Sequence, residues 1–442
     1  MKYISKIDKD FMPILLEMNE FKKTANSKIE IMIEDGDGYN FSYNFVASCD
    51  RERSYKIIER LVKSLLWIVG GYKIYIKGAD DIALRIKNDY NSVRTFDRDF
   101  MSDIYQKNFE VVAVNELPQL KMRNILVGGH TNGCRIGFDA GGSDRKVSAV
   151  VDGKVVFSEE VVWFPKINSD LQYHYDAIVS AFKSAAAHMP RVDAIGVSSA
   201  GIHINNRTQV ASLFLKIPKE NKEKTKDIYI RAGKEIGENV PIVVANDGDI
   251  TAIAGAMIYK SGNILGISMG TSEAGGYVNE NKGLNGWLSE LAFVPCDCNK
   301  NAHLDEWSGD IGTGVNYFSQ DAVINLAKMA GIDFENDLSP ALKLEYVQDL
   351  MKKGEEKAAE IYRTIGIYLG YTIPFYAEFY NIKYVLLLGR VLTGLGGDKI
   401  KQTATMILND EFSSYNIKIV TADEEFKRNG QSIAAASLPI VK

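Results

Sequence analysis

A short run around two adjacent glycines most constrains how this chain can fold. Residues 136–152 begin with an apolar approach, continue through Asp139, Gly141, Gly142 and Ser143, and end in alternating apolar residues. This pattern predicts a β-hairpin with a turn suited to phosphate, because glycines let the backbone approach an anion and a serine hydroxyl can donate to it. Asp139 at the strand end can hold Mg²⁺ through water. Taken alone, the run is equally typical of an ordinary Gly-Gly hairpin with a solvated aspartate.

Composition excludes several classes of protein. The chain has 442 residues, of which 46% are hydrophobic, enough for a large core and two or three domains. No apolar run reaches the roughly 20 residues of a membrane span, and the first residues lack the apolar core of a signal peptide, so we expect a cytoplasmic protein with no membrane partner. The net charge of -5 disfavours nucleic acid as a partner. Four cysteines are too few for a disulfide framework.

The first 124 residues have a character of their own. Strand-like runs at 28–34 and 40–46 flank a turn at 35–38, a helical pattern covers 55–69, and another strand-like run covers 72–77. This order predicts a small α+β domain of unknown role over residues 1–124, within the usual domain size. Residues 121–135 are the most linker-like stretch.

After residue 136 the pattern changes to strand, helix and glycine turn. A buried strand at 241–245 ends in Asn246 and Asp247, and open α/β sheets place their sites at such strand ends. An Asn-Asp pair there is also typical of a helix cap. A second glycine hairpin at 264–278 contains Gly270 and Thr271, and a third turn at Gly389 follows a helical stretch from about 355 to 380. Two such hairpins suggest duplicated sheets that hold a triphosphate, and the third turn suits an adenosine pocket.

The order of these segments resembles the ROK family of sugar kinases and repressors, within the hexokinase, Hsp70 and actin superfamily. Residues 139–143 resemble its first phosphate loop, 246–247 its catalytic Asn-Asp turn and 270–276 its second phosphate loop. Residues 289–293 fall on its Glu-x-Gly-His substrate motif and 296–305 on its zinc motif. The resemblance implies an α/β fold of duplicated ribonuclease H-like ATPase domains, at 134–255 and 256–442, with a cleft between these two domains, in addition to the small α+β N-terminal domain.

The resemblance also implies an activity, which is ATP-dependent phosphorylation of a sugar hydroxyl, on a hexose or an amino or N-acetyl sugar. Asp247 would be the general base, with Mg²⁺ near Asp139. The expected sugar contacts are Asn246, Glu290, Asp305 and His203. The expected ATP contacts are Asp139, Gly141, Gly142, Ser143, Gly270, Thr271 and Gly389. Relatives are often dimers, so the resemblance implies a homodimer.

Several departures from the family pattern leave alternatives open. Phe293 stands where the family has a zinc-binding histidine, and Arg390 replaces a glycine of the adenosine turn. Cys296, Cys298 and His303 are three of four zinc ligands, so this segment either binds Zn²⁺ or holds free buried thiols.

These departures also keep open a protein that senses sugar or regulates without catalysis. A DNA-binding repressor is disfavoured, since residues 1–124 carry 20 Lys and Arg against 19 Asp and Glu and do not begin like a winged helix.

Overall fold

The structure is a computed structural model that describes residues 1–335, 337–421 and 424–441. The chain forms two compact units. Unit 1 consists of Met1–Arg123, Ile267–Gly275 and Gly286–Val420, and unit 2 of Asn124–Gly266, Gly276–Asn285 and Thr421–Lys442. Residues 1–123 therefore share a unit with most of the second half of the chain. The division at 124, 134–255 and 256–442 stays a prediction.

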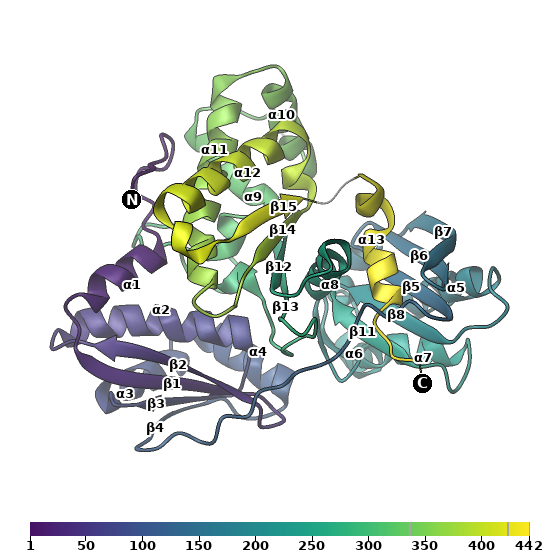
Figure 1. The fold of residues 1–442 in the computed structure, drawn as a ribbon, viewed down its shortest axis with the longest axis horizontal. Helices are drawn as coiled ribbons and strands as arrows, with labels where there is room; N and C mark the ends of the chain where they lie inside the picture. Colours follow the sequence, from purple (N-terminus) through teal and green to yellow (C-terminus); the bar gives the residue numbers. More distant parts are fainter. Residues whose placement is uncertain (336, 422–423, 442) are drawn as a thin grey trace. The chain divides into compact units, whose positions relative to one another are not determined.

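The N-terminal part of unit 1 is built on a four-stranded sheet of order β2-β1-β3-β4 (Figure 1). Its elements are α1 (Ile14–Lys22), β1 (Ser27–Glu34), β2 (Asn40–Ala47), α2 (Arg51–Val69), β3 (Lys73–Lys77), α3 (Asp80–Tyr90), α4 (Thr95–Tyr105) and β4 (Glu110–Ala113). The carboxylate of Asp50 caps α2 by accepting from the Arg53 N–H, and Gly70 ends it with a φ of 83°. The expected strands and helix are confirmed.

Unit 2 is built on a five-stranded sheet of order β11-β8-β5-β6-β7. Its strands are β5 (Cys134–Ala140), β6 (Asp144–Val151), β7 (Lys154–Val162), β8 (Ala194–Ser199) and β11 (Ile242–Asn246), beside the two-stranded pair β9 (Ile202–Ile204) and β10 (Arg207–Val210). Its helices are η1 (Pro165–Ile167), α5 (Leu171–Ala186), η2 (Ser212–Phe214), α6 (Lys219–Lys226), α7 (Ile228–Lys234), α8 (Asp247–Tyr259) and α13 (Glu424–Ala436).

Glycines let α13 pack directly on this sheet. A Cβ at Gly137 on β5 would lie 1.8 Å from the Ser432 carbonyl oxygen, and one at Gly196 on β8 would lie 1.6 Å from that of Ala435. Apolar side chains of α5 and α7 cover the strands in the main core cluster of this unit, which includes Phe138, Phe182 and Tyr229. The hairpin predicted at 136–152 is confirmed as β5 and β6.

The remaining elements lie mostly in unit 1. A four-stranded sheet has the order β13-β12-β14-β15, with β12 (Ile264–Met269), β13 (Glu273–Val278), β14 (Tyr384–Leu388) and β15 (Lys418–Thr421). The boundary between the units falls within β12, β13 and β15. The helices are η3 (Leu291–Phe293), η4 (Gly314–Asn316), α9 (Gln320–Met329), α10 (Pro340–Lys352), α11 (Glu356–Tyr376), η5 (Arg390–Leu392), α12 (Gly394–Glu411) and η6 (Ser413–Tyr415).

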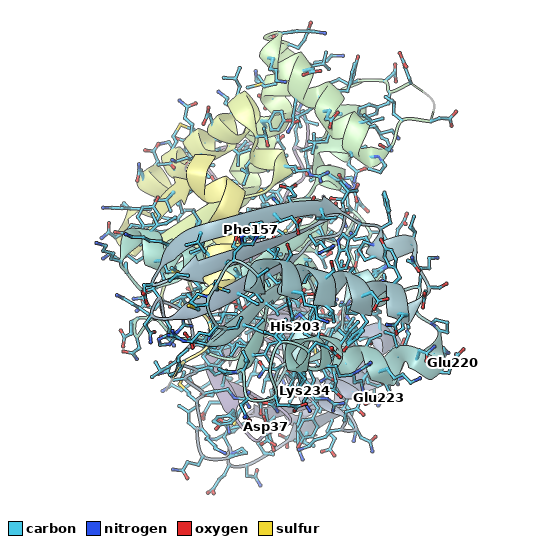
Figure 2. All side chains as sticks on the ribbon, turned by 90° about the vertical axis from the view of Figure 1, so that its right-hand side faces the viewer. Asp37, Phe157, His203, Glu220, Glu223 and Lys234 are labelled. Carbon is cyan, nitrogen blue, oxygen red and sulfur yellow. The ribbon has the colours of Figure 1, made fainter. Side chains whose placement is uncertain are left out.

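One segment has more structure than its charge pattern indicates. Residues 216–226 have the composition of a solvated loop, but Lys219–Lys226 forms helix α6. Figure 2 shows Glu220 and Glu223 of this helix pointing outward, and both are exposed. The helix forms because lysine and glutamate have good helix propensity even without an apolar face. No helix in the described part of the chain is long and apolar enough to cross a membrane.

Candidate active site

Three neighbouring parallel strands of unit 2 bring the predicted acidic residues to one edge of the sheet. In β5 and β8, Asp139 pairs with Ser198, and in β8 and β11, Ser199 pairs with Asn246. All three strands end within two residues of these pairs. Asp247 follows β11 directly and begins α8. The register thus places Asp139 and Asp247 at the carboxyl ends of strands one strand apart, where open α/β sheets hold ligands.

Both carboxylates have raised pKa values, and the charge of Asp247 acts on Asp139. Burial, together with the nearby charge of Asp247, raises the pKa of Asp139 to about 6, although a 2.7 Å hydrogen bond from the Ser198 hydroxyl acts to lower it. Burial also raises the pKa of Asp247, although the Gly248 N–H donates to Oδ1 at 3.0 Å and Lys166 lowers the pKa by its charge. Negative charge here is costly without a cation nearby.

Two predicted sugar contacts have structural partners. Asn246 caps α8, because its side-chain oxygen accepts from the Gly248 N–H at 2.7 Å and its amide donates to the Gly201 carbonyl at 2.7 Å. Both ring nitrogens of His203 (Figure 2) are engaged, with the Thr208 hydroxyl at 3.1 Å and the Ser199 carbonyl at 3.0 Å. Burial lowers the pKa of His203 to about 4, so the ring is neutral. Both residues therefore shape the loops beside the carboxylates.

Trp163 holds the turn at residues 141–143, the predicted first phosphate loop, in place. The Trp163 indole N–H donates to the Gly141 carbonyl at 2.8 Å, and the backbone N–H of Trp163 donates to the Ser143 carbonyl at 3.1 Å. Trp163 is buried, while Gly142 and Ser143 are exposed. The Ser143 hydroxyl donates to Asp144 at 3.0 Å. The turn is thus rigid and still open to solvent at Gly142.

A lysine that the sequence analysis missed lies beside this turn. The Lys166 ammonium lies 2.9 Å from the position that a Cβ on Gly142 would take. It belongs to η1, whose Pro165 carbonyl is 3.1 Å from Nε2 of the buried His174. Pro165 is a local sequence signal for the start of η1. Only the tertiary fold, however, brings Lys166 to Gly142 and near Asp247. Asp249, with a pKa raised to about 7 mainly by burial, was also missed.

In unit 1, the second and third glycine turns lie at the same end of neighbouring strands. Gly270 follows β12, and its carbonyl accepts from the Gln320 N–H at 2.8 Å. Gly389 follows β14 with a φ of 108°, and a Cβ there would lie 2.2 Å from the Met269 carbonyl oxygen. Only glycine fits such a close approach with that φ. Gly270, the exposed Thr271 and Gly389 are thereby brought together.

The other predicted sugar contacts lie on one segment of unit 1, residues 286–313. Glu290 is half-buried, and Ser289 before it has a φ of 51°. Asp305 is 8% exposed, and its carboxylate accepts from the backbone N–H groups of Trp307 at 3.2 Å and Ser308 at 2.9 Å. Much of the hydrogen-bonding capacity of Asp305 is therefore used by its own turn.

The structure does not assemble the three expected zinc ligands. Among the described residues, no group of three or more His, Cys, Asp or Glu side chains could hold a metal ion. The Cys296 thiol donates to the Gly312 carbonyl at 3.4 Å, and burial raises its pKa well above its usual value. Burial also raises the pKa of Cys298 to about 12. Neither cysteine forms a disulfide, and the ring of His303 lies beside that of Tyr317, with centroids 6.5 Å apart. The choice between a zinc site and free thiols stays a prediction.

The oxygen donors at the carboxyl ends of the unit 2 strands suit Mg²⁺ better than Zn²⁺. Mg²⁺ prefers carboxylate and water oxygens, and it is usually held by one or two carboxylates together with substrate phosphates. Asp139 meets this requirement, since its pKa is raised by burial and by Asp247 and a cation would relieve both effects.

Comparisons with known proteins give no match in sequence and many in structure. No family model matches the chain, and no curated protein matches it. A ROK-family glucokinase from Streptomyces griseus, solved with glucose and AMPPNP, is similar with a TM-score of 0.53 at 19% identity, over 69% of this chain and 98% of that one. A ROK hexokinase from Thermus thermophilus has a TM-score of 0.53 at 16% identity, over 69% and 97%. A ROK transcriptional regulator, a homologue of the E. coli MLC protein, has a TM-score of 0.55 at 15% identity, over 80% and 87%.

These likenesses confirm the fold that the resemblance implies, since both kinases and regulators align over more than two thirds of this chain. The chain has the α/β fold of the ROK family, of the hexokinase and actin-like ATPase type.

Proposed function

We propose that this protein transfers the γ-phosphoryl group of ATP to a hydroxyl of a sugar. The observation that carries the proposal is the pair Asp139 and Asp247 at the carboxyl ends of β5 and β11, with Lys166 beside the first phosphate loop. Two carboxylates, a nearby cation and a glycine turn are the parts that phosphoryl transfer uses. The similarity of the fold to a glucokinase and a hexokinase supports the same reaction class.

Each residue has a role in this proposal. Asp247 accepts the proton of the attacking sugar hydroxyl, and burial holds its pKa above the ordinary value, nearer the operating pH of a general base. Asp139 would hold Mg²⁺ through water, and the ion, when bound, neutralises charge on the phosphate oxygens. In unit 2, the turn at Gly141, Gly142 and Ser143 binds phosphate. Lys166 adds positive charge beside that turn.

Unit 1 supplies the remaining roles. The turns at Gly270, Thr271 and Gly389 bind the nucleotide, with Gly389 at the adenosine. Glu290 and Asp305 accept hydrogen bonds from sugar hydroxyls, with the Asp305 carboxylate also held by the N–H groups of its own turn. Charged oxygens suit this task because a carboxylate accepts strong hydrogen bonds from hydroxyls. A sugar is the proposed small-molecule partner, and a homodimer is the proposed assembly.

The test is ADP release with Mg·ATP over a panel of hexoses, amino sugars and N-acetyl sugars, with the wild type beside Asp247→Asn. Asparagine keeps the shape of the side chain but cannot accept the proton, so we expect kcat to fall by about 10³-fold while ATP still binds. Sugar-dependent turnover that survives in Asp247→Asn would overturn the role of Asp247.

One observation favours a second candidate, a regulator that binds sugar without turnover. The likeness to the ROK regulator spans 80% of this chain, against 69% for the two kinases. The N-terminal part, however, is a four-stranded sheet rather than a helical DNA-binding domain. Tight sugar binding by calorimetry, with no ADP release for any sugar of the panel, would favour this candidate.

A further inference from the structure

Among the parts of unit 1 that residues 1–123 contact is the segment of residues 286–313, which carries Glu290 and Asp305. At the end of α2, the carbonyls of Trp67, Ile68 and Val69 have no partner within the helix. They accept from the backbone N–H groups of Glu290 at 3.0 Å, Ser289 at 2.9 Å and Leu288 at 3.2 Å. The last turn of α2 is thus capped by the backbone of the segment that carries Glu290.

Glycine at position 70 makes this close approach possible. A Cβ on Gly70 would lie 2.5 Å from Cγ of Leu288. Next to it, Phe293 packs on Trp67 with ring centroids 4.2 Å apart and on Phe96 at 5.7 Å. Trp67 is itself buried and donates its indole N–H to Asp97 at 2.9 Å. Aromatic packing and backbone hydrogen bonds therefore fix residues 288–293 against α2 and α4.

A buried ion cluster fixes the other end of the segment. Asp310 lies 2.9 Å from Lys63, 2.9 Å from Arg60 and 2.7 Å from Arg94, and its side chain is only 4% exposed. Glu59 and Asp97 complete the cluster, at 2.8 Å from Arg94 and 3.2 Å from Lys63 respectively. Three cations thus face three carboxylates.

The cluster keeps Asp310 ionised. Burial acts to raise the pKa of this carboxyl, but the charges of Arg60 and Lys63 outweigh burial and the pKa is lowered. A charge so fully paired holds its own backbone in place, because removing one partner of a buried ion pair leaves an uncompensated charge.

Asp310 is bonded directly to the turn that carries Asp305. The Asp305 N–H donates to the Asp310 carbonyl at 2.7 Å, and the Ile311 N–H donates to the Asp310 carboxylate at 2.9 Å. Leu304 and Ile311 form a β-bridge across the same turn. Between Glu290 and Asp305, the backbone N–H of Cys298 donates to the Met12 carbonyl at 2.8 Å.

From these contacts we infer that residues 1–123 position the sugar-binding segment, with Lys63 and Asp310 as the central positioning pair. The inference rests on the proposed function for the statement that Glu290 and Asp305 serve a sugar. The mechanical part does not depend on it: α2 holds Glu290 at one end of the segment, and the ion cluster holds the turn of Asp305 at the other. Positioning of this kind raises affinity by reducing the ordering that binding requires.

Amide hydrogen exchange followed by mass spectrometry tests the mechanical part without any substrate. In the full-length wild type, we expect the amides of residues 288–290 to exchange as slowly as those in the middle of α2. In Asp310→Asn, which keeps the shape but removes the charge facing three cations, exchange across 286–313 should rise at least tenfold. Exchange over β5 and β6 in unit 2 should not change.

The control is Arg85→Met, which breaks an exposed ion pair with Glu52 on the same N-terminal part and should leave the segment unchanged. Rapid exchange of 288–290 in the wild type would overturn the inference, whether or not Asp310→Asn folds. So would a folded Asp310→Asn with wild-type exchange across 286–313. The double variant Lys63→Met/Asp310→Leu removes both charges and should keep the fold while still loosening the turn.

Kinetics test the connection to sugar. In Asp310→Asn, KM for the sugar substrate should rise tenfold or more, while KM for ATP stays within twofold of the wild type. A rise in both constants, or in neither, would contradict a positioning role at the sugar. If no sugar is turned over by the wild type, the proposed function fails and the exchange experiment still decides the mechanical part.

Discussion

At the scale of single residues, the Lys166 ammonium lies beside Gly142 and lowers the pKa of Asp247 by its charge. Replacing it in Lys166→Met removes positive charge from both the turn proposed to bind phosphate and Asp247, the proposed base. We expect kcat with Mg·ATP to fall by about 10²-fold, since fixed charges at transferring phosphates contribute strongly. The acid limb of the kcat–pH profile should also move to higher pH, because Asp247 would lose the cation that favours its ionised form.

The control for this change is Lys154→Met, on the exposed outer strand β7, which should behave as the wild type. Lys166→Arg should keep most of the activity, because it restores the charge. A pH profile that does not move in Lys166→Met, even with reduced kcat, would show that Lys166 does not act on Asp247.

The site residues that could be predicted from the sequence are those marked by a pattern in their immediate neighbours. Asp139, Asp247 and the glycines of the three turns stand at strand ends that alternation of apolar residues predicts, and the structure puts these turns at strand ends. Lys166 and Asp249 were missed because no local pattern marks them. Lys166 reaches the glycine turn only through η1, and Asp249 lies two residues after Asp247 in the first turn of α8. His203 and Asn246 have hydrogen-bond partners that only tertiary contacts reveal.

At the scale of elements, the end of β14 crosses very close to the end of β12. Gly389 has a φ of 108°, and a Cβ there would lie 2.2 Å from the Met269 carbonyl oxygen. Gly389→Ala must therefore shift one strand against the other and also strain the backbone. We expect a loss of roughly 3 kcal/mol in unfolding free energy, above the ~1–2 kcal/mol of a left-handed residue alone. ATP affinity should fall with it.

Gly394 is the matched control, because it has a φ of 65° but nothing within 4 Å of its Cβ position. Gly394→Ala should cost only about 1 kcal/mol, from backbone strain without a clash. Urea unfolding and calorimetric titration with AMPPNP measure the two quantities. Equal losses in Gly389→Ala and Gly394→Ala would mean that the close approach of β14 to β12 contributes nothing.

Helices and strands could be predicted where apolar residues recur with a regular spacing within the element itself. The strands at 28–34, 40–46 and 72–77 and the helix at 55–69 all have a clear period, and they match β1, β2, β3 and α2. Residues 286–313 show no periodic pattern of apolar residues. Their conformation depends instead on backbone hydrogen bonds to α1 and α2 and on the ion pairs of Asp310. Their partners are more than 200 residues away in sequence, so no pattern within the segment could predict them. The zinc expectation depended on such a local pattern.

At the scale of the whole molecule, buried carboxyls in both units make stability depend on pH. Burial raises the pKa of Asp249 to about 7 in unit 2 and that of Glu273 to about 8 in unit 1. A folded-state pKa above the unfolded value means that the folded protein binds the proton more tightly. The resulting stability is fully present below about pH 4 and is lost as the pH rises through 7 and 8.

Glu273 offers the sharpest test, because its Oε2 is buried without a hydrogen-bond partner. Its shift from 4.5 to about 8 corresponds to roughly 5 kcal/mol between pH 4 and pH 9. Glu273→Gln cannot ionise, so its unfolding free energy should fall much less than that of the wild type over this range. The exposed Glu345→Gln is the control and should keep the wild-type dependence of unfolding free energy on pH.

Urea unfolding followed by tryptophan fluorescence reports mainly on unit 1, which holds Trp67, Trp287 and Trp307. The Tyr376 hydroxyl donates only a long hydrogen bond of 3.4 Å to Oε1, so this buried carboxylate is costly to ionise. A wild type equally stable at pH 5 and pH 8 would therefore show that Glu273 gains a further partner or water when it loses its proton.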